Sequence, residues 1–271
     1  MGPAIALLLL LAAGVSFQVL RSRRRRSARR AEVFDDLLTL DVSGRVFRAP
    51  DLEGLPDRAA AWLRNALVPG QPVSLTVDVR LAGHIRAPGE DEWLPFRARQ
   101  RVSAGKGFIW EGRLAALGPF FLSGAEWFRD GRHESRFDLQ GLFPAVREGG
   151  EAEGRAARSR FLLEHLWLPA ALLPASGAAW SETGDGLAAV VPAGWDVPLG
   201  LGIEPGGVLR SASVLRFRPD TNRMANFGLS VEREGDFDGH RLPARFAGGW
   251  DFGTDDYVET IRATVESVRY F

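Results

Sequence analysis

Residues 72–81 read PVSLTVDVRL, and this stretch decides how the chain folds. Its apolar and polar residues alternate, and a period of two is typical of a β-strand with one buried face and one face in water. The same alternation returns in residues 96–102, FRARQRV, and in residues 108–114, FIWEGRL, after short connections. Strands at this spacing, joined by short turns, favour an antiparallel meander over β-α-β units.

Strand-like segments recur along the rest of the chain. Asp130-Gly131, a typical hairpin-turn pair, lies between two of them, and the last one is rich in β-branched residues. The further segments are residues 120–128, 133–139, 187–191, 208–217, 227–233, 244–250 and 257–270. Together with the first three, they predict a sheet of about ten strands.

Two segments have helical rather than strand periodicity. Leu55-Pro56 opens the first, in which apolar residues recur three and four positions apart until Pro69-Gly70 ends it. The second covers residues 151–168 and is followed by the apolar turn PAALLP at residues 169–174. A large antiparallel sheet with one apolar face needs a cover. We therefore predict an α+β domain over residues 55–271, in which a strongly curved antiparallel sheet wraps around one or two helices.

The N-terminal residues have the composition of a membrane anchor. Pro3–Leu20 contains no charge, and as a helix it would span ~27 Å, close to the hydrocarbon thickness of a bilayer. No basic residue precedes this run and arginines follow it. A retained transmembrane helix is therefore favoured over a cleaved signal peptide and over a buried helix of the domain. We predict an anchor over residues 1–30 and a linker over residues 31–54.

The apolar run is followed by a block of arginines without an intervening acid: Arg21, Arg23, Arg24, Arg25, Arg26, Arg29 and Arg30. Lys+Arg and Asp+Glu balance at 34 each over the whole chain, so the rest of the chain is net acidic. A net-acidic body disfavours nucleic acid as a partner, whereas arginines beside an anchor are expected to contact anionic lipid headgroups. Because basic flanks stay on the cytoplasmic side, we predict a single-pass protein of the bacterial cytoplasmic membrane with its domain on that side.

The residues that usually carry catalysis or metal binding are missing or scattered. The chain has no Cys, no Gly-x-Ser-x-Gly elbow, no Walker loop and no His-Glu-x-x-His zinc motif. Its four histidines are far apart in sequence, at His84, His133, His165 and His240. Glu234, Asp236, Asp238 and Gly239 match the start of a calcium loop, but Arg245 stands at the twelfth position, where such a loop needs Glu, so a hairpin turn is favoured. We predict no cofactor, no metal site and no enzymatic activity.

Several motifs resemble an uncharacterised bacterial family whose members are usually anchored at the N-terminus. They are Leu55-Pro56, Trp62-Leu63, Gly83-x-Ile85-Arg86, Trp93-Leu94-Pro95-Phe96-x-Ala98-x-Gln100, Gly107-Phe108-Ile109-Trp110, and Arg160-x-x-x-Glu164-x-x-Trp167-Leu168-Pro169-x-x-Leu172-Leu173-Pro174 with Trp180 after it. The resemblance covers residues 55–271 and departs from the family around residues 120–140 and 192–207. The turn Gly239-x-Arg241-Leu242-Pro243 is also similar to turns in half-barrel carriers of the LolA/LppX type. That similarity implies a half-barrel-like sheet and lipid binding.

Arg160 and Glu164 are four positions apart and share one face of the second predicted helix. The pair either orients a ligand head group at the mouth of a cavity, or pins the helix on the sheet as a structural ion pair, or is exposed. The aromatic residues likewise either line a pocket for an apolar or acyl ligand or fill the core. The candidate ligand-binding residues are Trp93, Phe96, Phe108, Trp110, Arg160, Glu164, Trp167 and Trp180.

Taken together, these features predict a membrane-anchored, non-enzymatic module that binds a lipid-like or other hydrophobic ligand. The alternative is a structural or protein-interaction module with a filled core and no ligand, and an enzyme without a recognisable motif is a third reading. A cavity of at least ~300 Å³ between the sheet and the helices would favour the binding module.

Overall fold

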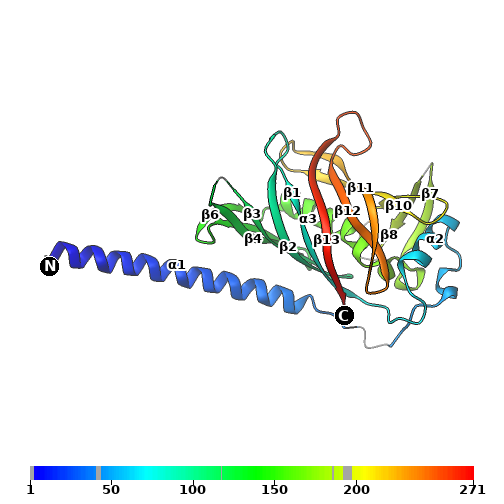
Figure 1. The fold of residues 1–271 in the computed structure, drawn as a ribbon, viewed down its shortest axis with the longest axis horizontal. Helices are drawn as coiled ribbons and strands as arrows, with labels where there is room; N and C mark the ends of the chain where they lie inside the picture. Colours follow the sequence, from blue (N-terminus) through cyan, green and yellow to red (C-terminus); the bar gives the residue numbers. More distant parts are fainter. Residues whose placement is uncertain (1–2, 41–43, 117, 185, 192–196) are drawn as a thin grey trace.

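A computed structural model describes residues 3–40, 44–116, 118–184, 186–191 and 197–271, and of residues 3–17 and 19 it describes the backbone alone. Its strands form one antiparallel sheet of thirteen, in the order β6-β5-β4-β3-β2-β1-β13-β12-β11-β10-β9-β8-β7. They are β1 (Thr76–Ile85), β2 (Leu94–Ser103), β3 (Gly107–Ala115), β4 (Phe121–Arg129), β5 (Arg132–Leu139), β6 (Phe143–Glu148), β7 (Ala179–Thr183), β8 (Gly186–Val190), β9 (Leu199–Ile203), β10 (Leu209–Arg218), β11 (Arg223–Phe237), β12 (His240–Trp250) and β13 (Val258–Tyr270). The sheet is strongly curved and does not close, because β6 and β7 remain its two edges (Figure 1).

The sheet consists of two meanders that meet at β1 and β13. β1 to β6 lie side by side in chain order, and so do β7 to β13. β1 pairs with β13 from Val77 opposite Tyr270 to Ile85 opposite Ile261, so the last strand of the chain lies against the first. The predicted antiparallel meander and the α+β class are therefore confirmed.

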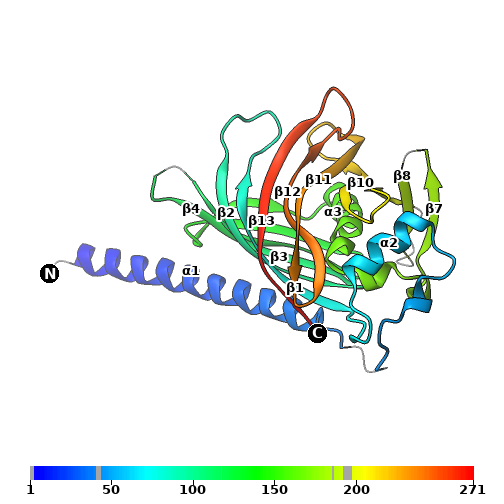
Figure 2. The ribbon, with the colours of Figure 1, turned by 45° about the vertical axis from the view of Figure 1, so that its right-hand side comes forward.

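Two α-helices and several short 3-10 helices occupy the hollow side of this sheet (Figure 1, Figure 2). α3 (Glu151–Glu164) contacts β3, β4 and β5 of one meander and β10 of the other, so it bridges the two. α2 (Asp57–Ala66) contacts β9 and β12. Short 3-10 helices complete the cover, at Ala49–Leu52, His165–Trp167, Pro169–Leu172 and Pro174–Ser176. The expected covering helices are thus present.

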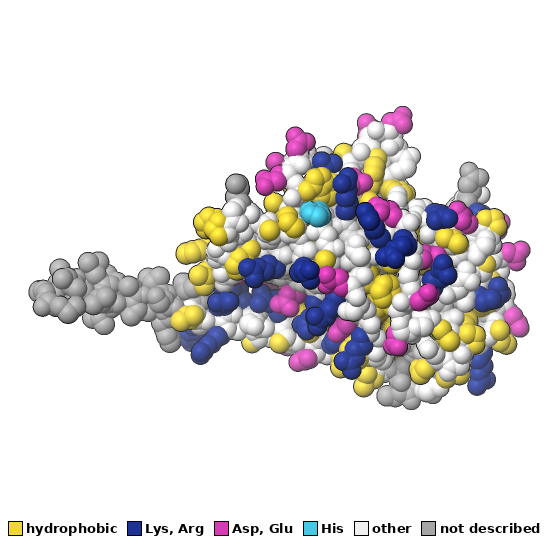
Figure 3. Space-filling model, in the orientation of Figure 1, with side chains coloured by type: hydrophobic (Ala, Val, Ile, Leu, Met, Phe, Trp, Pro, Cys, Tyr) yellow, Lys and Arg dark blue, Asp and Glu magenta, His cyan; other side chains and the backbone are white. Residues whose placement is uncertain are grey.

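Strand alternation separates an apolar inner face from a charged outer face. In β1, Val77, Val79 and Leu81 are buried while Arg80 between them is exposed. Cross-strand ion pairs tie the outer side chains together, among them Arg97–Glu266 (3.0 Å). Figure 3 shows basic and acidic side chains mixed over this side of the molecule. Burial of the apolar face, at roughly 25 cal/mol per Å² of apolar surface, is what holds the sheet around the helices.

The sheet has more strands than the ten predicted. β6 and β7 are short edge strands whose residues are mostly exposed on both faces, so they lack an alternating apolar pattern. β9 (LGLGI) carries Gly200 and Gly202 at every second position, and glycine has low β-propensity. The helix predicted to reach Leu168 ends at Glu164 and continues as a 3-10 turn, because the residue before Pro169 is kept out of the α conformation.

α1 (Pro3–Asp36) is longer than the predicted anchor, and its last turns lie on the outer face of β3, β4 and β5. Phe34 and Leu37 pack there against Ile109 and Trp127. This contact explains why four consecutive residues of β3, Gly107 to Trp110, are buried: α3 covers one face of the strand and α1 covers the other.

The predicted membrane-spanning run Pro3–Leu20 lies outside the residues described with side chains, apart from Gln18 and Leu20. Within the part of the chain that is described, no helix combines the length and the apolar character needed to cross a membrane. Parts of the predicted linker, residues 31–54, are packed on the domain: Leu37, Phe47 and Leu52 are buried.

Candidate functional site

A cavity of about 380 Å³ lies between the hollow face of the sheet and α3. Its lining is mostly apolar, and it draws on strands of both meanders and on the helix. The lining residues are Leu81, Ile85, Arg86, Pro88, Gln100, Trp110, Leu114, Leu122, Glu126, Phe137, Val146, Arg160, Leu163, Glu164, Trp167, Arg216, Phe227, Leu229, Phe246, Trp250, Thr260 and Ile261. The volume falls within the range of small-molecule sites, so the interior is not fully packed with side chains.

The cavity has a buried end and a less buried end. Gln100, Glu164 and Trp167 at one end are almost fully buried, whereas Ile85 and Val146 are half-buried.

Trp110 forms part of the cavity wall. Its indole lies across Gly112 of the same strand, where a Cβ would overlap the ring, so the position of the ring depends on a glycine there. The indole also packs on Phe96 (ring centroids 5.6 Å apart) and Phe137 (6.0 Å). These contacts hold Trp110 in place and leave the remaining volume open.

A cluster of charged groups lies at one side of this apolar space, with Arg160 of α3 at its centre. Nε of Arg160 donates to Oε1 of Glu164 (2.9 Å), and Nη1 donates to Oε2 of Glu126 on β4 (2.5 Å). The guanidinium also lies over the Phe108 ring, 4.7 Å from its centroid. Arg160 therefore holds the helix to β4 by charge-assisted hydrogen bonds.

The carboxylate of Glu164 is satisfied by further donors. The amide of Gln100 on β2 and Nε1 of Trp167 (3.2 Å) both donate to its Oε2. A buried carboxylate needs such partners, since an unpaired one is costly. Glu164 thus ties α3 to the sheet and fixes the orientation of the Trp167 indole at the buried end of the cavity.

Burial and the neighbouring charges shift the pKa values of the groups in the cluster. Burial alone would raise the pKa of Glu126, but the charge of Arg160, with help from His133 and Arg216, lowers it to about 2. Burial would lower the pKa of Arg160, yet its two carboxylate partners raise it. Burial and repulsion by Arg160 lower the pKa of Arg216 to about 10. All three groups are therefore ionised at neutral pH.

The structure brings together four of the residues singled out from the sequence. Trp110, Arg160, Glu164 and Trp167 line the cavity. Phe96 and Phe108 lie behind its wall: Phe96 packs on Trp110, and Phe108 stacks on Phe161 of α3 with ring centroids 6.4 Å apart.

The other two predicted residues lie away from the cavity. Trp93 is stacked between the guanidinium groups of Arg86 and Arg262, each 4.7 Å from its ring centroid. Trp180 packs against Trp62 and donates its Nε1–H to the carbonyl of Leu172 (2.8 Å). Both side chains have partners that account for their positions.

The ligand-binding residues predicted from the sequence omit three charged residues of the cavity wall, Arg86, Glu126 and Arg216. For Glu126 and Arg216, the sequence holds a signal in the alternation of strand residues, because residues two positions apart lie on the same face of a strand. Arg216 lies on the same face of β10 as the buried Ala212 and Val214. Glu126 lies on the same face of β4 as the buried Phe128. Read in this way, both charges belong to the inner face of the sheet.

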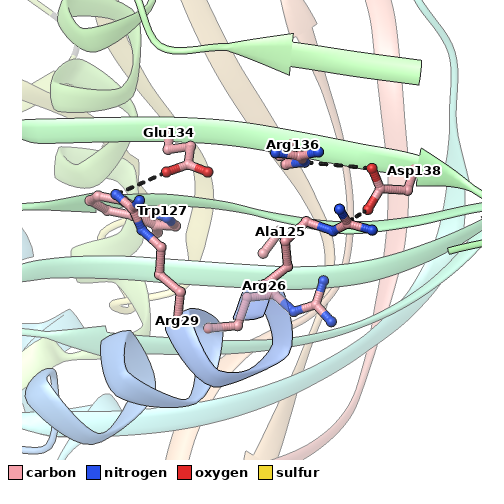
Figure 4. Close-up of a pocket in the computed structure, with 8 residues that line it drawn as sticks. Arg26, Arg29, Ala125, Trp127, Glu134, Arg136 and Asp138 are labelled. Carbon is pink, nitrogen blue, oxygen red and sulfur yellow. Dashed lines mark ion pairs between the residues drawn. The ribbon is translucent and has the colours of Figure 1, made fainter. Parts of the chain in front are cut away.

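The arginine block is divided by its contacts with the outer face (Figure 4). Arg26 pairs with Asp138 (3.1 Å), and Arg29 pairs with Glu134 (3.0 Å). Arg30 pairs with Glu111 (3.0 Å). The pocket between these groups has a volume of about 30 Å³, which is room for about one water molecule. The remaining arginines of the block are exposed, at Arg21, Arg23, Arg24 and Arg25.

Residues 45–260 match the model of a family described as "Family of unknown function (DUF6544)". No curated protein matches the chain. The match covers well over half of the chain and most of the sheet, including every residue that lines the cavity except Ile261.

Solved structures with a similar arrangement share little sequence with the chain. A LolA superfamily protein from Nitrosomonas europaea has a TM-score of 0.43 at 9% identity and covers 79% of this chain and 92% of its own. A DUF1329 family protein from Desulfovibrio piger ATCC 29098 has a TM-score of 0.41 at 13% identity, covering 73% and 86%. An outer membrane lipoprotein-sorting protein domain from Vibrio parahaemolyticus has a TM-score of 0.40 at 8% identity, covering 72% and 85%. At these values the similarity says nothing about the ligand.

Proposed function

The chain belongs to DUF6544, a family of unknown function, and we propose that it is a non-enzymatic module that binds a lipid-like or other hydrophobic ligand in the cavity under α3. The observation that carries this proposal is the apolar cavity of about 380 Å³. It is larger than the ~300 Å³ lower bound of small-molecule sites. A module that only presents its outer surface to a protein partner needs no such space.

The size of the cavity limits the ligand to roughly one acyl chain. A methylene group is about as large as a water molecule, roughly 30 Å³, so about a dozen methylenes fit. Each buried methylene contributes ~0.8 kcal/mol, and the sum must exceed the cost of association. A single saturated chain meets this requirement, whereas a bulky multi-chain lipid would leave most of its apolar surface outside.

A cavity-filling pair of variants tests the proposal. Leu114→Trp places an indole in the cavity, while Leu215→Trp makes the same change at an exposed position of β10. We expect the full-length chain to bind 1-dodecanol, measured by calorimetry and by native mass spectrometry, and Leu114→Trp to bind at least ~10-fold more weakly. Leu215→Trp should bind as the wild type does. If 1-dodecanol does not bind, or if Leu114→Trp binds it unchanged, the filled-core interaction module becomes the better explanation.

We further propose that the N-terminal segment attaches the domain to the bacterial cytoplasmic membrane, with the domain on the cytoplasmic side. The uncharged run Pro3–Leu20 and the exposed arginines after it support this proposal. The Cys-free chain makes labelling of Asp255→Cys, in an exposed loop, specific. We expect a membrane-impermeant thiol reagent to label it only after the cells are permeabilised. Labelling in intact cells would place the domain outside.

A further inference from the structure

We propose that the ligand carries a negatively charged head group and that Arg216 of β10 binds it. This inference rests on the proposed function, because it names the chemical class of the molecule in the same cavity.

Arg216 is a cation in the cavity wall that lacks an acidic partner. Its one hydrogen bond within the described chain runs from Nε to the backbone carbonyl of Ala156 (3.2 Å). Among the described residues, no carboxylate lies within ion-pair distance of it. The rings of Phe227 and Trp250 flank the guanidinium at 4.8 and 5.0 Å, so they fix its position without occupying its terminal N–H groups.

The other cavity arginines are engaged elsewhere. Arg160 is bound by two carboxylates, Glu126 and Glu164. Arg86 donates to the backbone carbonyls of Glu259 (2.8 Å) and Glu90 (3.4 Å) and stacks on Trp93. Arg216 is therefore the cavity arginine whose Nη groups are left for a ligand within the part of the chain described.

The largely apolar surroundings of the Arg216 guanidinium favour the binding of an anion there. A guanidinium among apolar walls whose terminal N–H groups lack an acceptor is costly, and an anion that accepts from them regains part of that cost. Its planar fork matches a carboxylate or a phosphate with two parallel hydrogen bonds. The neighbouring Arg160 carries one positive charge against the two negative charges of Glu126 and Glu164, so Arg216 completes the charge balance of the cluster from a distance, without an ion pair of its own among the described residues. The cavity thus combines room for one acyl chain with one unpaired cation, which describes a single-chain anionic amphiphile.

Three ligands with the same chain test the assignment: 1-dodecanol, dodecanoate and dodecyl phosphate, each below its critical micelle concentration at neutral pH. We expect the full-length wild type to bind at least one of the two anions ~10- to 100-fold more tightly than the alcohol, the range typical of a hydrogen bond to a charged group. Which anion binds more tightly distinguishes a fatty acid from a phosphate head group. Arg216→Met, close in volume, should abolish the preference while 1-dodecanol binding is kept, and Arg216→Lys should retain part of it.

Arg210→Met is the matched control, since it removes an arginine of the same strand that lies outside the cavity and pairs with Glu204 at the surface, and it should leave the preference unchanged. Retained binding of 1-dodecanol by Arg216→Met shows that the variant is folded and that the cavity is intact. Equal binding of alcohol and anions by the wild type, or a preference that survives Arg216→Met or disappears in Arg210→Met, would overturn the assignment. The proposed function would still stand in those cases, because it fails only if 1-dodecanol does not bind or if Leu114→Trp binds it unchanged.

Discussion

Arg160→Met should lower the free energy of unfolding by about 3–5 kcal/mol, the cost typical of removing one partner from a buried ion pair. The substitution leaves Glu126 and Glu164 without their shared cation, while Gln100 and Trp167 still donate to Glu164. Urea titration of the full-length chain, followed by tryptophan fluorescence, measures the change. A loss below ~1 kcal/mol would show that the carboxylates find other partners or water.

Two comparisons separate charge pairing from lost packing. Arg155→Met removes an arginine at the same spacing from an acid on the same helix, but its pair with Glu151 (3.3 Å) is exposed, so the expected loss is under ~1 kcal/mol. Adding Glu126→Gln and Glu164→Gln to Arg160→Met removes the unpaired charges and should restore most of the stability. No recovery in that triple variant would assign the loss to packing of the Arg160 side chain instead.

Acid should weaken the fold through Glu126. Its pKa of about 2 in the folded chain lies below the ordinary value of 4.5, so ionised Glu126 stabilises the fold by about 3 kcal/mol at neutral pH. This contribution is complete above pH ~4.5 and is lost as the pH falls toward ~2, because the carboxyl is then protonated in both states. We expect the difference in unfolding free energy between wild type and Glu126→Gln to shrink over that interval.

The exposed Glu151 provides the reference for this experiment. Glu151→Gln should differ from wild type by a small amount that changes little with pH. A gap between wild type and Glu126→Gln that is the same at pH 3 and pH 7 would mean that Glu126 is not held ionised by Arg160 and its neighbours.

These expectations bear on the three readings of the Arg160–Glu164 pair. In the structure the pair holds α3 to β2 and β4, and both ends of it are satisfied by protein groups. That arrangement favours the structural reading. In our proposal, Arg216 then binds and orients the head group of the ligand, since its terminal N–H groups have no acidic partner among the described residues.

The sequence alone determined most of the strands and both covering helices. Alternation in residues 72–81 and 96–102 is a local property, since each residue's face follows from the backbone period. Asp130-Gly131 fixed a hairpin turn for the same reason: both residues have positive φ, 49° and 77°. The edge strands β6 and β7 were not predicted, because a strand exposed on both faces has no alternating apolar pattern in its sequence. The packing of α1 on the outer face was not predicted either, because its contacts join residues far apart in the chain.

Only the tertiary structure decided whether the interior holds a ligand. A cavity is the small difference between the space enclosed by the sheet and the volume of the side chains that enter it, and no local pattern reports that difference. The same holds for charge. Sequence spacing predicted that Arg160 would meet Glu164, four residues away, but that Glu126 joins them and that Arg216 is left without a carboxylate depends on how β4 and β10 are brought around α3. Partners across a curved sheet are set by packing, which the chain determines as a whole.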